Sequence, residues 1–137
     1  MMLKFSLGLF IILHGLVHLW YVALSQRLVE FQPEMGWSSR SWLFTDLLGD
    51  AATRSLASVL FIMATLGFVA AGVGILLSTS WWRLLLLGAA LLSTAILLVL
   101  WDGSTQFIVE KGLIGLLINF VVIALMLFGQ GRALPGL

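Results

Sequence analysis

The chain contains no cysteine and very few charged residues. Only 9% of its 137 residues are charged, against about 25% in soluble domains. The absence of cysteine excludes disulfides, Cys-ligated zinc, iron–sulfur clusters and thiol catalysis. The formal net charge is +1 and no basic run is present, so we expect no nucleic-acid partner.

Apolar surface is abundant instead. Hydrophobic residues make up 61% of the chain, and the mean hydropathy is +1.14. A water-soluble globule of this length would have to expose apolar surface that it could not hide. The composition therefore predicts an integral membrane protein, whose first partner is the lipid bilayer.

Four apolar stretches are long enough to cross a hydrocarbon core of about 30 Å, which takes about 20 helical residues. They cover roughly residues 5–25, 55–77, 81–101 and 112–128. The first stretch has the flanks of a secretory signal, but the histidines inside it favour a retained span. We predict an all-α bundle of four transmembrane helices that forms one membrane domain over residues 1–137.

Three connections join these stretches. Residues 78–80 form a tight turn, which predicts an antiparallel hairpin, and residues 102–111 form a short polar loop. The first loop, residues 26–54, is much longer. Its segment Trp42–Leu48 mixes apolar and polar side chains before Gly49, a pattern typical of a short amphipathic helix at the membrane interface.

An even number of spans places both termini on one side of the membrane. Lysine and arginine are divided three against four between the two sides, which does not decide the orientation. All acidic residues fall on the side opposite the termini: Glu30, Glu34, Asp46, Asp50, Asp102 and Glu110. We expect cytoplasmic termini, with the long loop outside a bacterial plasma membrane.

Polar residues follow one face of the first span. His14, His18, Tyr21 and Ser25 recur at helical spacing. Polar groups in hydrocarbon are costly, so each is a functional hypothesis. We expect this stripe to face the bundle interior, because lipid offers imidazole nitrogens no partner.

Three roles are open for the two histidines. They could hold the register of neighbouring helices through hydrogen bonds. They could bind a small lipid-soluble molecule such as a quinone, or handle protons, in a pocket between the first and fourth spans. They could also hold a metal ion or haem, with a further ligand from Asp102, Glu110, Asn119 or another protomer.

Asn119 is the only amide in the middle of a span, and it is our first choice as the histidines' hydrogen-bond partner. It serves either to join two helices through hydrogen bonds or as the far wall of the pocket.

Hydroxyls on the second and third spans are expected to bond back to the backbone of their own helix: Ser58, Thr65, Ser93 and Thr94. Small residues predict packing seams at 67–74 and 88–90.

Charged residues bracket the last loop. The candidates for acid–base chemistry here are Asp102, Glu110 and Lys111; the alternative is that they only form a solvated loop.

No acidic residue lies in the middle of a span, which excludes a proton-coupled small multidrug exporter. A phosphate-binding glycine loop, a nucleophile elbow and a Ser/His/Asp set are also absent, so the sequence favours a non-enzymatic role.

The segment Gly8–Leu19, GLFIILHGLVHL, resembles the first helix of DoxX-like proteins, although His18 stands where that family has lysine. The closing segment Gly129–Leu134 is similar to the family's Gly-Pro-Gly-Arg ending, with Gln130 in place of proline. The His-Gly-x-x-His pattern also resembles that of an uncharacterised bacterial group. The resemblance implies a four-helix membrane protein, in some cases a subunit associated with quinone-linked oxidoreductases.

Two functions therefore stand side by side. The first is a non-enzymatic accessory or interaction subunit that packs against other membrane subunits or a second copy of the chain. The alternative is a binding or redox-assisting protein for a quinone, lipid, haem or metal that uses His14, His18, Tyr21 and Asn119.

Overall fold

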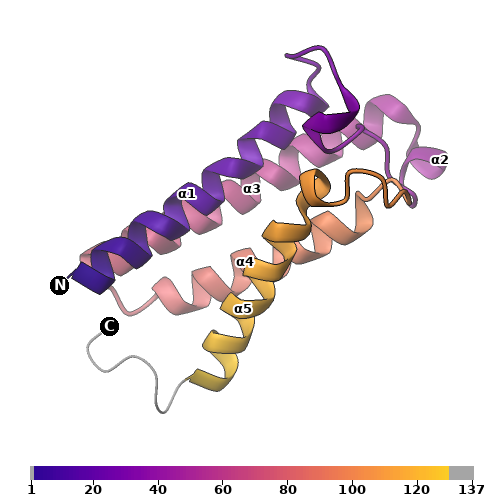
Figure 1. The fold of residues 1–137 in the computed structure, drawn as a ribbon. Coiled ribbons are helices and arrows are strands. Elements are labelled where there is room, and N and C mark those ends of the chain that lie inside the picture. Colours follow the sequence, from indigo (N-terminus) through magenta and orange to yellow (C-terminus); the bar gives the residue numbers. More distant parts are fainter. Residues whose placement is uncertain (1, 130–137) are drawn as a thin grey trace.

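The computed structural model describes residues 2–129, and these residues contain four long helices and no strand (Figure 1). The long helices are α1 (Met2–Ser25), α3 (Asp50–Leu77), α4 (Trp82–Val99) and α5 (Ile114–Phe128). Three short elements accompany them: η1 (Pro33–Met35), α2 (Thr45–Leu48) and η2 (Val109–Leu113). Four segments are long and apolar enough to span a membrane, the last being Val109–Phe128. The predicted all-α four-helix architecture is confirmed.

The helices do not begin and end where the apolar stretches do. Helix α1 begins at Met2, and α3 begins at Asp50 rather than near residue 55. Backbone hydrogen bonds favour continuing a helix past the hydrocarbon, and the Asp50 carboxylate suits the positive N-terminal end of α3.

Most of the closing segment whose sequence resembles that of DoxX-like proteins, including Gln130 and Arg132, lies outside the described residues.

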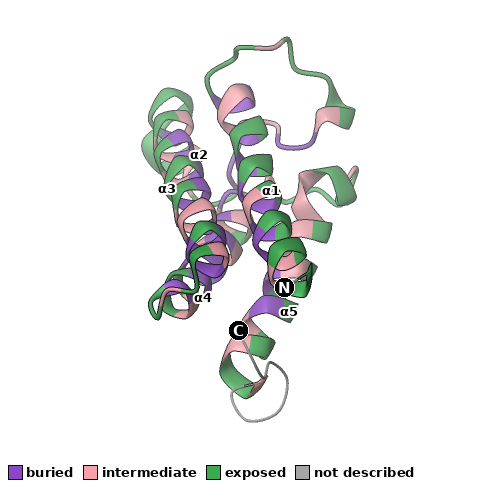
Figure 2. Cartoon of the chain, turned by 90° about the vertical axis from the view of Figure 1, so that its left-hand side faces the viewer, coloured by how far each residue is buried: buried purple, intermediate pink, exposed green. Residues whose placement is uncertain are grey.

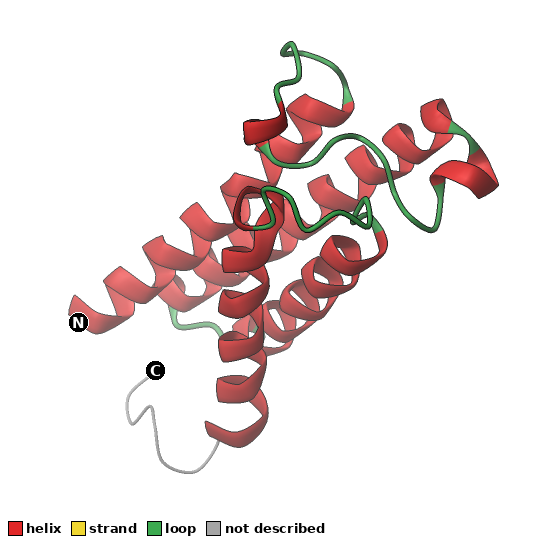
Figure 3. Ribbon diagram, turned by 45° about the vertical axis from the view of Figure 1, so that its right-hand side comes forward, coloured by secondary structure: helices red, strands yellow, loops and turns green. Residues whose placement is uncertain are grey.

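Successive long helices run antiparallel and pack in chain order. Helix α1 lies along α3 and α3 along α4, while α5 packs on α4 and crosses it obliquely (Figure 1). The Lys4 ammonium donates to the Ser78 hydroxyl, which ties the start of α1 to the α3–α4 turn. The long first loop and the loop after α4 lie together at the opposite end (Figure 3). Helix α5 diverges from α1 towards Phe128.

Glycines let α1 and α3 approach closely. A Cβ atom at Gly72 would lie 2.8 Å from the Gly8 carbonyl oxygen, and one at Gly15 would lie 2.6 Å from Phe68 Cβ. Such small-residue contacts are a main source of helix association in lipid. On the α3–α4 side, a Cβ at Gly67 would lie 3.0 Å from Ala89 Cβ, in the expected seam. Gly88 faces open space, so the prediction for Gly88 was wrong.

The first loop caps the C-terminal end of α4. The last carbonyls of a helix have no partner within it. Here Trp42 Nε1 donates to Leu98 O at 2.9 Å, Trp37 Nε1 donates to Leu100 O at 2.6 Å, and Trp42 N donates to Trp101 O at 2.7 Å. The Ser41 hydroxyl donates to the carbonyl of Val99. Side chains and backbone of this loop thus satisfy four consecutive carbonyls.

This capping explains why the predicted interfacial helix is shorter than expected. We predicted a helix over Trp42–Leu48, but α2 covers only Thr45–Leu48 before Gly49. Trp42 is held by its bonds to α4 and so does not enter the helix. The apolar side chains of the segment are nevertheless exposed, with Leu47 at 73% and Leu48 at 45%, as an interfacial segment requires.

Buried residues lie along the sides of the helices that face one another (Figure 2). They form two apolar clusters, one centred on Phe68 and Leu86 and the other on Phe61 and Leu100. The side chain of His18 contacts both phenylalanines, with ring centroids 5.5 Å from Phe68 and 6.1 Å from Phe61. His18 therefore lies between the two clusters, while Tyr21 of the same stripe belongs to the second.

The close α1–α3 contact makes the first prediction. We expect Gly72→Ala to destabilise the protein by about 1–3 kcal/mol, because the new methyl group must push α1 away from α3. The matched control Gly88→Ala meets no atom within 4 Å and should be neutral or stabilising by about 0.5–1 kcal/mol. Denaturant unfolding in detergent measures both. Equal stability of the two variants would contradict the packing described here.

Candidate ligand-binding site

Both histidines of α1 are shielded, as expected. His14 is 7% exposed and His18 is 4% exposed. Their rings pack on Phe68 of α3, with the centroid of His14 only 4.8 Å away in an edge-on arrangement. The helical spacing of the histidines turns them towards the bundle, and Gly15 between them lets α3 come near enough for this contact.

Four polar side chains from three helices form one hydrogen-bonded network. His14 Nε2 and Asn119 Oδ1 are 3.1 Å apart, which confirms the expected contact between α1 and α5. Asn119 Nδ2 donates to Ser93 Oγ on α4 at 2.9 Å. Ser93 Oγ also lies 2.7 Å from His18 Nε2. Asn119 and Ser93 are completely buried.

Ser93 is the member of this network that sequence reasoning missed. Thr65 does bond back to its own helix, at Phe61 O, as predicted. Ser58 does so at Arg54 O and also meets Ser25 Oγ of the polar stripe. Ser93 instead bridges α1 and α5. It follows Ala89 by four residues and so lies on the small-residue face of α4. That position could have predicted that its hydroxyl faces the other helices.

Tyr21 anchors the loop end of the site through η2. Its hydroxyl donates to the Glu110 carbonyl at 3.1 Å. The chain enters α5 through a π-helical turn in which Gly112 has φ +108°, a conformation that favours glycine. A Cβ there would lie 2.7 Å from Leu97 Cδ2 and 3.2 Å from the Tyr21 hydroxyl. Glycine therefore permits the close approach of η2 to α1.

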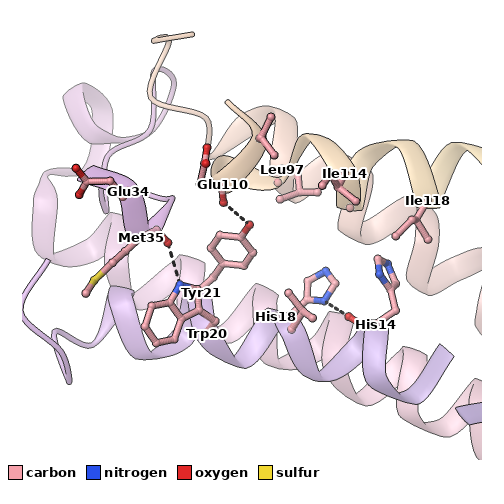
Figure 4. A pocket seen from close by; sticks show the side chains of 14 residues that line it. His14, His18, Trp20, Tyr21, Glu34, Met35, Leu97, Glu110, Ile114 and Ile118 are labelled. Carbon is pink, nitrogen blue, oxygen red and sulfur yellow. Dashed lines mark hydrogen bonds between the residues drawn. The ribbon is translucent and has the colours of Figure 1, made fainter. Parts of the chain in front are cut away.

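A cleft of about 520 Å³ lies between α1 and the η2–α5 segment (Figure 4). His14, His18 and Tyr21 line it from α1. Its remaining wall is largely apolar, and includes Val17, Leu97, Val109, Ile114 and Ile118. Glu34, Met35 and Glu110 stand at its loop end. Asn119 does not line the cleft but supports it from behind, through His14.

The geometry does not favour the metal and haem alternatives. His18 Nδ1 faces the carbonyl oxygens of Gly15 and His14, at 3.2 and 3.3 Å, and its Nε2 faces Ser93. Neither nitrogen is available to a metal without breaking these contacts. Among residues 2–129, no group of three His, Cys, Asp or Glu side chains could hold a metal ion.

Asp102 and Lys111 form an ion pair rather than a pair poised over the cleft. Lys111 Nζ lies 2.8 Å from Asp102 Oδ2, and the two side chains are only 9% and 13% exposed. Asp102 also accepts from the Ser38 hydroxyl and the Ser104 backbone. Glu110 touches the site through its carbonyl, while the residue as a whole is exposed. The ion pair fastens three stretches of loop together.

Burial alone would raise the pKa of Asp102. The hydrogen bond and positive charge of Lys111, together with the hydrogen bonds from Ser104 and Ser38, outweigh this effect and hold the pKa below its ordinary value of 3.8. The carboxylate is therefore stabilised in its charged form, which suits a structural partner and opposes a role as a proton donor.

No family model, curated protein or solved structure matches this chain. The function must therefore be argued from the network and the cleft themselves.

Acid should remove the stabilisation that the Asp102–Lys111 pair provides. Because the folded-state pKa is lowered, that stabilisation is complete above pH 3.8 and is lost as the pH falls through the lower folded-state pKa. We expect Asp102→Asn to lower Tm at neutral pH, and the gap to the wild type to narrow in acid. Thermal unfolding from neutral pH to about pH 2.5 measures this. In the control Asp46→Asn, which removes an exposed carboxylate, the gap should stay small throughout.

Proposed function

We propose that this protein binds a lipid-soluble small molecule in the cleft between α1 and α5. The observation that supports this most directly is the combination of a largely apolar cleft of about 520 Å³ with the side chain of His14 inside it. Ligand sites have this composition, in which apolar walls supply affinity and a few polar groups fix orientation. The apolar lining suits a molecule that arrives from the membrane.

The proposal is for binding and not for catalysis. Asp102 and Lys111, the candidates for acid–base work, are paired with each other. His18 has both ring nitrogens engaged with the protein. In a redox-assisting role, a bound quinone or its reduced form would carry out the electron transfer, and the protein would only bind and orient it.

A side chain added at Gly115 tests the proposal. A Cβ there would lie 4.0 Å from His14 Cε1 and 3.8 Å from Leu97 Cδ1, which is ordinary contact distance. Gly115→Leu should therefore fill the cleft beside His14 without disrupting the helix. We expect mass spectrometry of extracts from purified wild type to find an equimolar lipid-soluble molecule that the variant lacks.

The control for this experiment is Gly88→Leu, whose new side chain points into open space. It should retain the bound molecule at the wild-type level. If wild type and Gly115→Leu carry the same amount of every extracted compound, the cleft is not a binding site.

A second candidate function rests on the exposure of α5. Only Asn119 and Val122 of this helix are buried, and large apolar side chains such as Phe120 and Val121 are more than half exposed. This supports an accessory subunit whose α5 packs on another membrane protein or a second copy of the chain. Gentle-detergent purification from native membrane should then yield a complex, and Val121→Trp should disrupt it. A monodisperse monomer would contradict this candidate.

The proposal includes membership of the DoxX-like group and a location in a bacterial plasma membrane with cytoplasmic termini. Gly8 and Gly15 support the first, because both lie at the α1–α3 contact, where a larger side chain would not fit. All acidic residues lie in the loops and short elements between the long helices or at the first residue of α3, on the side opposite the termini, which supports the proposed orientation.

A further inference from the structure

The direction of the hydrogen bonds in the network follows from two backbone carbonyls. His18 Nδ1 lies 3.2 Å from Gly15 O and 3.3 Å from His14 O. Carbonyl oxygens only accept, so Nδ1 carries the proton. No acidic side chain pairs with either imidazole in residues 2–129, and the apolar surroundings favour the neutral ring. His18 Nε2 is then an acceptor.

Each remaining bond is fixed in turn. Since His18 Nε2 accepts, the Ser93 hydroxyl must donate to it across the 2.7 Å contact. The Ser93 oxygen is then free to accept from the amide of Asn119 at 2.9 Å. The Asn119 Oδ1 atom accepts in turn from His14 Nε2 at 3.1 Å. A neutral His14 with its proton on Nε2 has a bare lone pair on Nδ1.

That lone pair is accessible from the cleft. His14 Nδ1 has no hydrogen-bond partner in the part of the chain that the structure describes. The only fully enclosed side-chain nitrogen or oxygen without a partner there is Thr94 Oγ1, so His14 Nδ1 is not sealed off. The ring lines the cleft and its Cε1 edge approaches Gly115 across it. The small exposed part of His14 therefore faces the cleft.

Tyr21 and Trp20, the other α1 side chains with a hydrogen-bond donor in the cleft, also donate to acceptors within the protein. Tyr21 donates its hydroxyl proton to Glu110 O, so only its oxygen lone pairs remain. Trp20 donates its indole N–H to Met35 O at 2.9 Å. The membrane-embedded part of the cleft therefore offers hydrogen-bond acceptors and no donors from these residues (Figure 4).

We propose that the cleft selects a lipophile whose headgroup donates a hydrogen bond, such as a phenol or hydroquinone, and that His14 Nδ1 accepts this bond. This inference rests on the proposed function and names the class of ligand. An oxidised quinone would instead need donors such as imidazole N–H or phenol O–H groups for its carbonyl oxygens, and the side chains of α1 in the cleft offer none. Because His14 and Tyr21 are seven residues apart, about 10 Å along the helix, a hydroxyl that donates to His14 cannot also reach the Tyr21 oxygen.

A matched pair of probes tests the selectivity. 4-Nonylphenol and its methyl ether, 4-nonylanisole, share an apolar body and differ in one O–H group. In nanodiscs, wild-type protein should bind the phenol about three- to tenfold more tightly, the worth of one hydrogen bond. Binding is followed through the imidazole ¹⁵N resonances of His14, where the phenol should shift Nδ1 and the ether should not. Gly115→Leu should abolish binding of both.

The network itself is tested with two neighbouring hydroxyl variants. Ser93→Ala removes the donor to His18 and the acceptor for Asn119, so the preference for the phenol should fall towards parity while the affinity for the ether stays unchanged. Thr94→Ala removes a hydroxyl without a partner and should keep the preference. Ser93 would thus be a positioning residue. Circular dichroism and Tm establish that both variants fold.

The outcomes separate the two proposals. Equal affinity for phenol and ether, lost in Gly115→Leu, would leave the cleft a binding site and overturn its selectivity. Binding that Gly115→Leu does not alter would overturn both. The ¹⁵N spectrum of the ligand-free wild type is an independent test, since the chain has only two histidines. A proton on His14 Nδ1 would refute the inference without any binding measurement.

Discussion

The hydroxyl group of Ser93 joins three helices at the centre of the molecule. It contacts His18 on α1 and Asn119 on α5 from its own place on α4. In hydrocarbon no water replaces a missing partner, so these groups are satisfied only when the helices stand in one arrangement. The network thereby holds α4 and α5 in place beside the histidines of α1, next to the cleft.

The sequence was sufficient to predict what depends on local hydrophobicity. The four spans follow from runs such as 55–77 because transfer of apolar side chains into lipid is roughly additive along a helix. The contact between His14 and Asn119 was also predictable, because two polar residues in the middle of different spans lie at the same depth and have few other partners.

Features that depend on the rotation of one helix against another were not predictable. Ser93 and Thr94 are adjacent and chemically alike, yet one bridges three helices and the other has no partner. The difference lies in how α4 is rotated against its neighbours, with Ala89 turned towards Gly67 of α3. The direction of the hydrogen bonds in the network could not be predicted from the sequence either, because it depends on how the His18 ring is oriented against its own helix backbone.

The capped end of α4 has a consequence for the lipid around the protein. At 1.5 Å per residue, α3 is about 42 Å long and α4 only about 27 Å, against a hydrocarbon core of about 30 Å. A helix that ends short of the interface would ordinarily expose bare carbonyls to acyl chains. Here Trp37, Ser41 and Trp42 already occupy those carbonyls. The bilayer beside α4 therefore need not thin to bring headgroups or water to this end of the helix.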